Sequence, residues 1–449
     1  MFNNQFKTYL KIGLIILITL LLLIPTNMIQ SLIHERELKQ EEVIRDVTSK
    51  WAGAQTINGP YLSIPYTKYV REAAAKDSAS KIIAVTGILH VLPESLKING
   101  NMSHEIRHRG IYNAVVYGSK LDLSGTFVLP NPDETGIPSS QLDLKHAKVN
   151  LGIDDLRGIE EQVSINWNQQ QVAFNSGLTD QELTKSGIHA NVNLEGQRID
   201  SNYTFGIKLA LKGSQNIRFV PVGKTTNVEL ASQWASPSFA GSFLPDQRTV
   251  SDKGFSAMWN IQHLNRNYPQ WWTGNRYEVA GSAFGVDLYT PVDNYQKTYR
   301  SIHYSILFIA ATFLVFFFIE VIRKIMIHPI QYFLVGIALV IFYILLLSLS
   351  EHIGFNPAFL VSALSTIALI VLYAKSILHS TALGSMLGGI ITILYAFIFI
   401  IIQEEDYALL MGSIGIFMVL AITMFVSRKI NWFEIHNVRK NKGPANELV

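Results

Sequence analysis

The chain has 449 residues, of which 49% are hydrophobic and 16% are charged, and its formal net charge is +3. So small a charge, with no long basic cluster away from the termini, gives no argument for nucleic acid, and we expect no nucleic-acid partner. Cysteine is absent, which excludes disulfide bridges, thiol nucleophiles and thiolate metal sites.

The first apolar run, Ile12–Ile24, follows two basic residues, Lys7 and Lys11, as in a signal peptide. No small-x-small cleavage site follows it, because the apolar sequence continues to Ile33. We therefore predict an uncleaved signal anchor that crosses the membrane over residues 12–31, preceded by a cytoplasmic N-terminus of residues 1–11.

The segment that follows, residues 32–299, is predicted to be one large domain outside the cytoplasm. It begins with apolar and charged residues at the spacing of an amphipathic helix, as far as Trp51. After this helix, apolar residues recur at every second position, a pattern typical of half-buried antiparallel strands. Turn-forming sequences such as 129–140 and 242–254 separate the runs. We expect a mostly β, sandwich-like domain. Its clearest strand alternates Tyr203, Phe205, Ile207, Leu209 and Leu211 with smaller or polar residues.

Five more apolar runs occupy residues 300–427, and each is long enough to cross the ~30 Å hydrocarbon core as a helix. The most continuous lies in His328–Phe355, which has no charged side chain between Gln331 and Ser348. The fold class predicted is a membrane α-helical bundle of six transmembrane helices, one before and five after the inserted β domain. The other four runs are Ile302–Phe318, Ala358–Ala374, Ala382–Ile402 and Ala408–Val426.

The distribution of charge sets the predicted orientation, because Lys and Arg concentrate in cytoplasmic segments. Six helices with both termini inside place the β domain in the periplasm and leave residues 428–449 as a basic cytoplasmic tail. The short outside loops then contain Glu351, His352, Glu404, Glu405 and Asp406 but no Lys or Arg. The inside segments contain Lys7, Lys11, Arg323, Lys324, Lys375, Arg428, Lys429, Arg439, Lys440 and Lys442.

Most standard chemical motifs are missing: there is no Walker loop, no dinucleotide fingerprint and no GxSxG, and HExxH occurs only as the letters HEIRH at His104–His108. His104 and His108 are close in sequence, in a stretch that reads as a loop, and that spacing does not predict a shared metal. We expect no cofactor and no metal site. Ionisable residues in the membrane runs, Glu320, Glu351 and Lys375, lie at helix ends, where an interface role is the simplest interpretation.

The sequence SLSEH, ending in Glu351 and His352, is the sharpest local candidate for a catalytic pair, because a carboxylate and an imidazole can exchange protons. Neighbours on a helix point about 100° apart, so the two need not face one site. Anchoring of the helix end, or docking to the β domain, is the favoured interpretation, and Glu351 and His352 are kept as weak catalytic candidates.

Two further features are expected to be structural. Gly384 and Gly388 share a helix face and suit close helix packing. Trp271 and Trp272 could form a membrane anchor or a carbohydrate platform, but the domain core is the default.

Seven stretches are distinctive when taken together: LIPTNMIQSLIHER (Leu23–Arg36), GPYLSIPY (Gly59–Tyr66), LPESLKINGN (Leu92–Asn101), RGIYNAVVY (Arg109–Tyr117), Pro237–Trp259, Thr290–Ala310 and His328–Phe355. In these stretches the chain resembles the CreD family, inner-membrane proteins of Gram-negative bacteria also called cell envelope integrity proteins. The resemblance implies an inner-membrane protein under envelope-stress control that is linked to envelope integrity and colicin tolerance, and it supplies no catalytic residues. The resemblance covers Leu23 to about Trp432 and is most specific in the last two of these stretches.

The functional hypothesis is non-enzymatic support of the envelope by binding or scaffolding. The partners expected are the lipid bilayer and an unidentified periplasmic protein, inner-membrane protein or other envelope component. One alternative is a membrane-embedded enzyme acting on a lipid or glycan at the periplasmic rim, with Glu351 and His352 converging on Asp246 or Arg248. The other is a transport component, which the apolar helix interiors disfavour.

Overall fold

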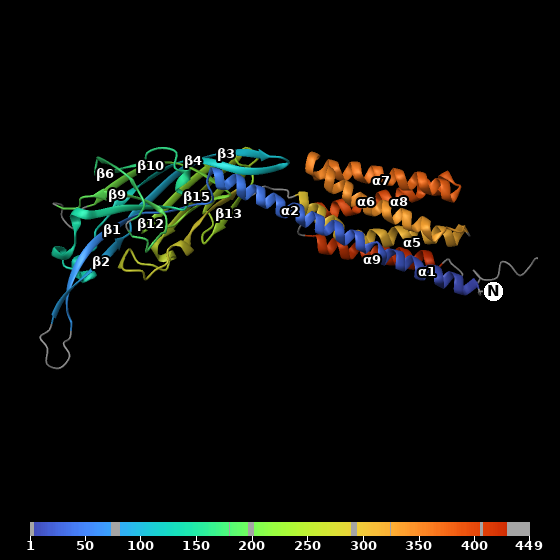
Figure 1. Cartoon of the computed structure of the whole chain (residues 1–449), viewed down its shortest axis with the longest axis horizontal. Coiled ribbons are helices and arrows are strands. Elements are labelled where there is room, and N and C mark those ends of the chain that lie inside the picture. The colour runs from blue at the N-terminus through green and yellow to red at the C-terminus, as the bar shows by residue number, and fades with distance from the viewer. Residues whose placement is uncertain are drawn as a thin grey trace, which may run out of the picture. The chain divides into compact units, whose positions relative to one another are not determined.

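The computed structural model describes residues 4–72, 81–178, 180–195, 202–288, 294–323, 325–404 and 407–428. These fall into two compact units, a helical unit (Met1–Glu41 with Val292–Val449) and a β unit (Glu42–Pro291) (Figure 1). The predicted basic tail beyond Arg428 lies outside the described residues, as do Lys324, Glu405 and Asp406.

Long apolar helices build the helical unit. Within the described residues, six helical segments have the length and hydropathy to cross a bilayer: Leu10–Trp51 near the N-terminus and five in the C-terminal part. The predicted arrangement of one helix plus five is therefore confirmed. The helices are α1 (Asn4–Leu21), α2 (Leu23–Trp51), α4 (Asn294–His303), α5 (Ser305–Arg323), α6 (Pro329–Ile353), α7 (Phe355–Leu378), α8 (Thr381–Gln403) and α9 (Ala408–Ser427).

Local sequence explains both ends of α6. His328 and Gln331 form a capping box at its start, where Pro329 needs no hydrogen-bond partner for its nitrogen. Gly354 ends it with φ 78°, a backbone conformation that other residues rarely adopt. The uncharged run that begins after Pro329 is thus one helix with its own start and stop signals.

Aromatic side chains hold α5 to α8 together. The ring of Tyr395 lies 4.4 Å from that of Phe308 and 4.7 Å from that of Phe342, and Phe342 meets Phe359 at 5.4 Å. At one end of the unit, the Nζ of Lys11 pairs with Glu320 and donates to the carbonyl of Ile327 at 2.6 Å. Close packing replaces the hydrophobic effect as the force between helices in lipid, and rings suit it.

The β unit contains two sheets in the part of the chain that is described, so the predicted mostly β fold is confirmed. In the nine-stranded sheet the path runs β13-β17-β11-β1-β5-β9-β8, and β2 joins β1 to β16. Its strands are β1 (Gln55–Glu72), β2 (Lys81–Val91), β5 (Ala147–Ile153), β8 (Asn175–Ser176), β9 (Gly187–Val192), β11 (Asn216–Phe219), β13 (Pro237–Gly241), β16 (Trp271–Thr273) and β17 (Phe284–Leu288).

The eight-stranded sheet has the order β14-β15-β12-β3-β4-β10-β6-β7. Pairing is antiparallel except between β1 and β11 and between β3 and β12. A short helix, α3 (Pro132–Thr135), lies between β4 and β5. The strands are β3 (Ser95–Arg109), β4 (Tyr112–Phe127), β6 (Ser164–Trp167), β7 (Gln170–Ala173), β10 (Tyr203–Ser214), β12 (Thr225–Ser232), β14 (Gln247–Ser251) and β15 (Gly254–Gln262).

The two sheets share one apolar core, which the alternating sequence predicts. On β10 the side chains from Tyr203 to Leu211 at every second position are buried, and Lys208 is exposed. Trp259 of one sheet lies 5.6 Å from Phe284 of the other, ring to ring. Period-two burial on facing sheets is the packing of a sandwich.

Two expectations about loops are wrong. The segment 242–254 contains strand β14, because Gln247–Ser251 pairs with β15. His104 and His108 lie on β3, where pairing with β4 holds the backbone extended. In both cases tertiary pairing overrides the polar, turn-like composition.

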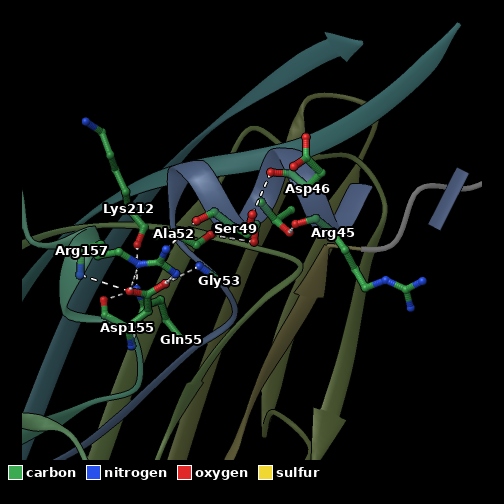
Figure 2. A network of polar contacts seen from close by, with 11 residues as sticks. Arg45, Asp46, Ser49, Ala52, Gly53, Gln55, Asp155, Arg157 and Lys212 are labelled. Carbon is green, nitrogen blue, oxygen red and sulfur yellow. Dashed lines mark hydrogen bonds and ion pairs between the residues drawn. The ribbon is translucent and has the colours of Figure 1, made fainter. Parts of the chain in front are cut away.

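The end of α2 is fixed to the β unit by a polar network (Figure 2). The carboxylate of Asp155 accepts from the backbone nitrogen of Gly53 at 2.9 Å and pairs with Arg157 through both oxygens, at 2.8 and 2.6 Å. Arg157 also donates to the carbonyl of Ser49 at 2.5 Å. The side chain of Gln55 bridges the carbonyls of Asp155 and Lys212. The last turn of α2 and the start of β1 are therefore held by charge-assisted bonds.

Candidate functional site

The predicted pair Glu351 and His352 occupies the end of α6, and the two side chains have different partners. Glu351 is largely buried: its Oε1 accepts from the hydroxyl of Tyr295 at 2.9 Å and lies 4.0 Å from the Nε of Arg36. His352 is exposed, and its Nδ1 lies 3.0 Å from the carbonyl of Ser348 in its own helix. The structure therefore does not join the carboxylate and the imidazole in one acid–base pair.

Asn294, the first residue of α4, binds the backbone at the end of α6 and at the start of α7. Asn294 donates from its amide to the carbonyl of Ser350 at 3.1 Å and accepts from the nitrogen of Phe355 at 3.2 Å. One side chain thus satisfies the last turn of α6 and the first turn of α7, whose backbone groups have no helical partner. Together with the Tyr295–Glu351 bond, these contacts tie α4 to the α6–α7 corner.

A cavity of about 990 Å³ lies beside α2 and α4 in the same unit. Its lining includes His34 and Glu37 from α2 and Tyr299, Arg300 and His303 from α4. Tyr299 and His303 are in ring contact at 4.9 Å. A polar and aromatic lining of this kind is typical of helices at a membrane interface.

The glycines that the sequence assigned to packing do pack. A side-chain carbon added at Gly388 would lie 2.5 Å from Val371 of α7, and one added at Gly384 would meet Lys375. Trp272 is buried in the β core and Trp271 packs against it, which confirms the default interpretation.

The other sequence candidates in the β unit also have local partners. His104 packs edge-on against Trp234 at 5.0 Å, and His108 shares a 2.7 Å hydrogen bond with Asn113. Asp246 accepts from the nitrogen of Asn260 at 2.7 Å. The guanidinium of Arg248 lies 5.7 Å from the ring of Phe239.

A polar cluster in the nine-stranded sheet was missed by the sequence reasoning. His90 of β2 has no exposed surface, and its two ring nitrogens face two carboxylates: Nδ1 lies 3.4 Å from Asp180 and Nε2 lies 2.9 Å from Glu182. The register places Ser63 of β1 opposite His90. Ser63 donates to Asp180 at 3.3 Å and accepts from the amide of Asn150 at 2.9 Å. No local spacing could reveal this cluster, because its residues come from four distant segments.

Tyr61 lies beside this cluster, with its ring 6.3 Å from that of His90. Burial, with a smaller contribution from the negative charge of Asp180, raises the pKa of Tyr61 far above its ordinary value. The phenol therefore stays protonated. A cavity of about 410 Å³, lined by Ser63, Asn150 and Asp180 among others, adjoins the cluster.

Strand β14 forms one end of the eight-stranded sheet, and all five of its residues are exposed. Val250 is 48% exposed, and Leu244 and Met258 nearby are 67% and 40% exposed. An edge with exposed apolar side chains is a template for pairing with another strand.

Comparison with known proteins points to one family. The profile described as "Inner membrane protein CreD" matches residues 7–433. A protein of Escherichia coli described in the same words is 32% identical over 422 residues, which are 92% of this chain and 91% of that protein.

Solved structures add no argument. Among those matched are two forms of an M1 zinc metallopeptidase from Deinococcus radiodurans, the wild type and an E-to-A mutant, at 9% and 10% identity. Each match covers 38% of both chains with a TM-score of 0.18. Such a score shows neither a shared fold nor a shared chemistry.

Proposed function

Because this chain belongs to the CreD family of inner-membrane proteins, we propose that it supports envelope integrity without catalysis, by binding an envelope protein through a periplasmic β domain. The family and the six apolar helices establish a multi-pass inner-membrane protein. The stress-linked role, the orientation and the partner are part of the proposal.

Charge supports the orientation. Lys11 pairs with Glu320 at one end of the helical unit. Arg323, three residues after Glu320, is the last residue of α5 at the same end. Glu351 and Glu404 lie at helix ends that the alternation of the helices puts on the other side. Lys and Arg favour the cytoplasmic side, so the β domain belongs in the periplasm, together with residues such as Glu351.

The rim of the bundle supports a non-enzymatic role. Glu351 accepts a hydrogen bond from Tyr295, and His352 contacts a backbone carbonyl of its own helix. A general acid or base has to reach a substrate, whereas these contacts join helices.

The observation that carries the binding proposal is the exposed edge strand β14. All five of its residues, Val250 among them, are exposed, and among the described strands it pairs with β15 alone. Addition of an extended segment to a sheet edge is a recurrent mode of recognition: main-chain hydrogen bonds supply affinity and side-chain pockets supply selectivity. The partner that fits is an extended segment of another envelope protein.

In-cell photo-crosslinking tests this proposal. A photoreactive residue at Val250 should capture a discrete protein, and the same residue at Lys208, exposed on the interior strand β10, should not. With the photoreactive residue moved to the exposed neighbour Thr249, Val250→Lys should abolish capture and weaken envelope function, since a charge on an edge opposes strand addition. Val250→Thr is the matched control and should keep both. Equal capture from both positions, or full function in Val250→Lys, would refute the proposal.

A further inference from the structure

The cluster around His90 brings together groups that bind metals. One ring nitrogen of His90, one oxygen of Asp180 and one of Glu182 all lie within 4.8 Å of one another. A single ion with bonds of about 2.0–2.2 Å binds only one of the two ring nitrogens, so the carboxylate that faces the other nitrogen has to turn toward the ion. His90 and Asp180 are buried, and the Glu182 side chain is 35% exposed.

The electrostatics of the cluster call for a cation. Two carboxylates with a neutral imidazole carry two negative charges, and removing such charges from water is costly unless they are paired. A divalent ion would neutralise both charges and accept the nitrogen lone pair. A protonated His90 would neutralise only one of them.

Buried polar atoms beside the cluster supply a second, independent observation. Among the described residues, Oδ1 of Asn150 and the hydroxyl of Tyr61 have no hydrogen-bond partner, although the two residues are 1% and 0% exposed. Asn150 belongs to the cluster, since its amide donates to Ser63, and the Tyr61 ring meets that of His90 at 6.3 Å. Buried groups of this kind are normally satisfied by water or an ion.

We propose that His90, Asp180 and Glu182 form a binding site for one divalent transition-metal ion. Zinc fits best, because imidazole with carboxylates suits it and three protein ligands are enough when a fourth position is open. The adjoining cavity of about 410 Å³ gives that position access to solvent or to a small anionic ligand.

Lysines are the competing source of positive charge. Lys145 and Lys148 line the same cavity, with His146. If they neutralise the carboxylates together with a protonated His90, the cluster needs no metal. The experiment has to separate these two cases.

Zinc titration of the purified full-length protein in detergent, after treatment with chelator, decides between them. We expect one zinc ion per chain by calorimetry and elemental analysis, and intense cobalt absorption bands typical of a tetrahedral site when cobalt replaces zinc. Glu182→Gln and Asp180→Asn should each weaken zinc binding by about tenfold or more. The matched control is Glu229→Gln, an exposed carboxylate paired with Lys97, and it should bind as the wild type does.

Two results overturn the proposal. One is a folded wild-type protein that does not bind one zinc ion per chain. The other is a Glu182→Gln variant that binds zinc as tightly as the wild type. Glu182 is partly exposed, so this variant should fold even if Asp180→Asn does not, and loss of the metal leaves the β14 edge and its crosslinking result unchanged.

Discussion

Asp155 should make the attachment of α2 to the β domain dependent on pH. Hydrogen bonds from the side chain of Arg157, and secondarily from the backbone nitrogen of Gly53, lower its pKa from 3.8 to about 2. A lowered pKa means that the ionised carboxylate is more stable in the folded state than in the unfolded state. This contribution is complete above pH 3.8 and is lost as the pH falls from 3.8 toward 2.

The size of the contribution follows from the pKa values. The difference between 3.8 and about 2 corresponds to at most roughly 2.5 kcal/mol, at about 1.36 kcal/mol per unit. The Asp155 side chain is 15% exposed, and its partner Arg157 is 64% exposed, so solvent screening reduces the value to about 1–2 kcal/mol. Asp155→Asn removes the charge but keeps an oxygen that can accept from Gly53. We therefore expect a loss of about 1–2 kcal/mol in the free energy of unfolding at pH 7.

Denaturant unfolding of the β domain in the full-length protein, followed by tryptophan fluorescence, measures this loss. Trp51 is a suitable reporter, because it lies beside the network with Lys212 4.8 Å from its ring. Asp143→Asn is the control: His146 lowers the pKa of that carboxyl too, but the pair is exposed, so little change is expected. Equal stability of Asp155→Asn and wild type at pH 7, or a gap that persists at pH 2, would refute the reasoning.

Three other predictions concern the core, the rim and the orientation. Leu209→Ala should cost roughly 2–5 kcal/mol of β-domain stability because Leu209 is 2% exposed, while Lys208→Ala, on the opposite face, should cost under about 0.5; equal losses in denaturation would contradict the strand register. Glu351→Gln keeps an acceptor for its tyrosine partner and should leave detergent resistance of the cell nearly intact, whereas a fall of about 10²–10⁴-fold at normal protein abundance would indicate proton transfer. A reporter that is active only in the periplasm should work when fused after Pro130 and stay silent after Arg428; activity at the second position would overturn the orientation.

Elements whose burial follows directly from chain periodicity were predictable. Strand β10 buries every second side chain, including Leu209, because side chains of a strand alternate between two faces. Helix α6 runs from Pro329 to Ile353, where an uncharged run meets a proline at one end and a glycine at the other. The expectation that the histidine pair lies in a loop was wrong, since His104 and His108 lie on strand β3, where each has its own partner.

Residues brought together by long-range pairing were not predictable. Glu351 is adjacent to His352 in sequence, yet its partner is Tyr295, 56 positions away. The His90 cluster depends on β1, β2 and β5 lying side by side and on a loop that carries Asp180 and Glu182 across them. Strand register and loop placement decide such contacts, and neither leaves a local pattern in the sequence.

The sequence by itself determined that this is a six-helix membrane protein with a β-rich insertion. Lipid requires continuous apolar runs and sheet packing requires alternating polar and apolar side chains, and both patterns can be read residue by residue. Only the tertiary structure decided that β14 is an exposed edge and that Glu351 is occupied by Tyr295. It also decided that His90 lies between two carboxylates. These three facts depend on which segments become neighbours, and that choice is made by the packing of the whole domain, which no single stretch of sequence encodes.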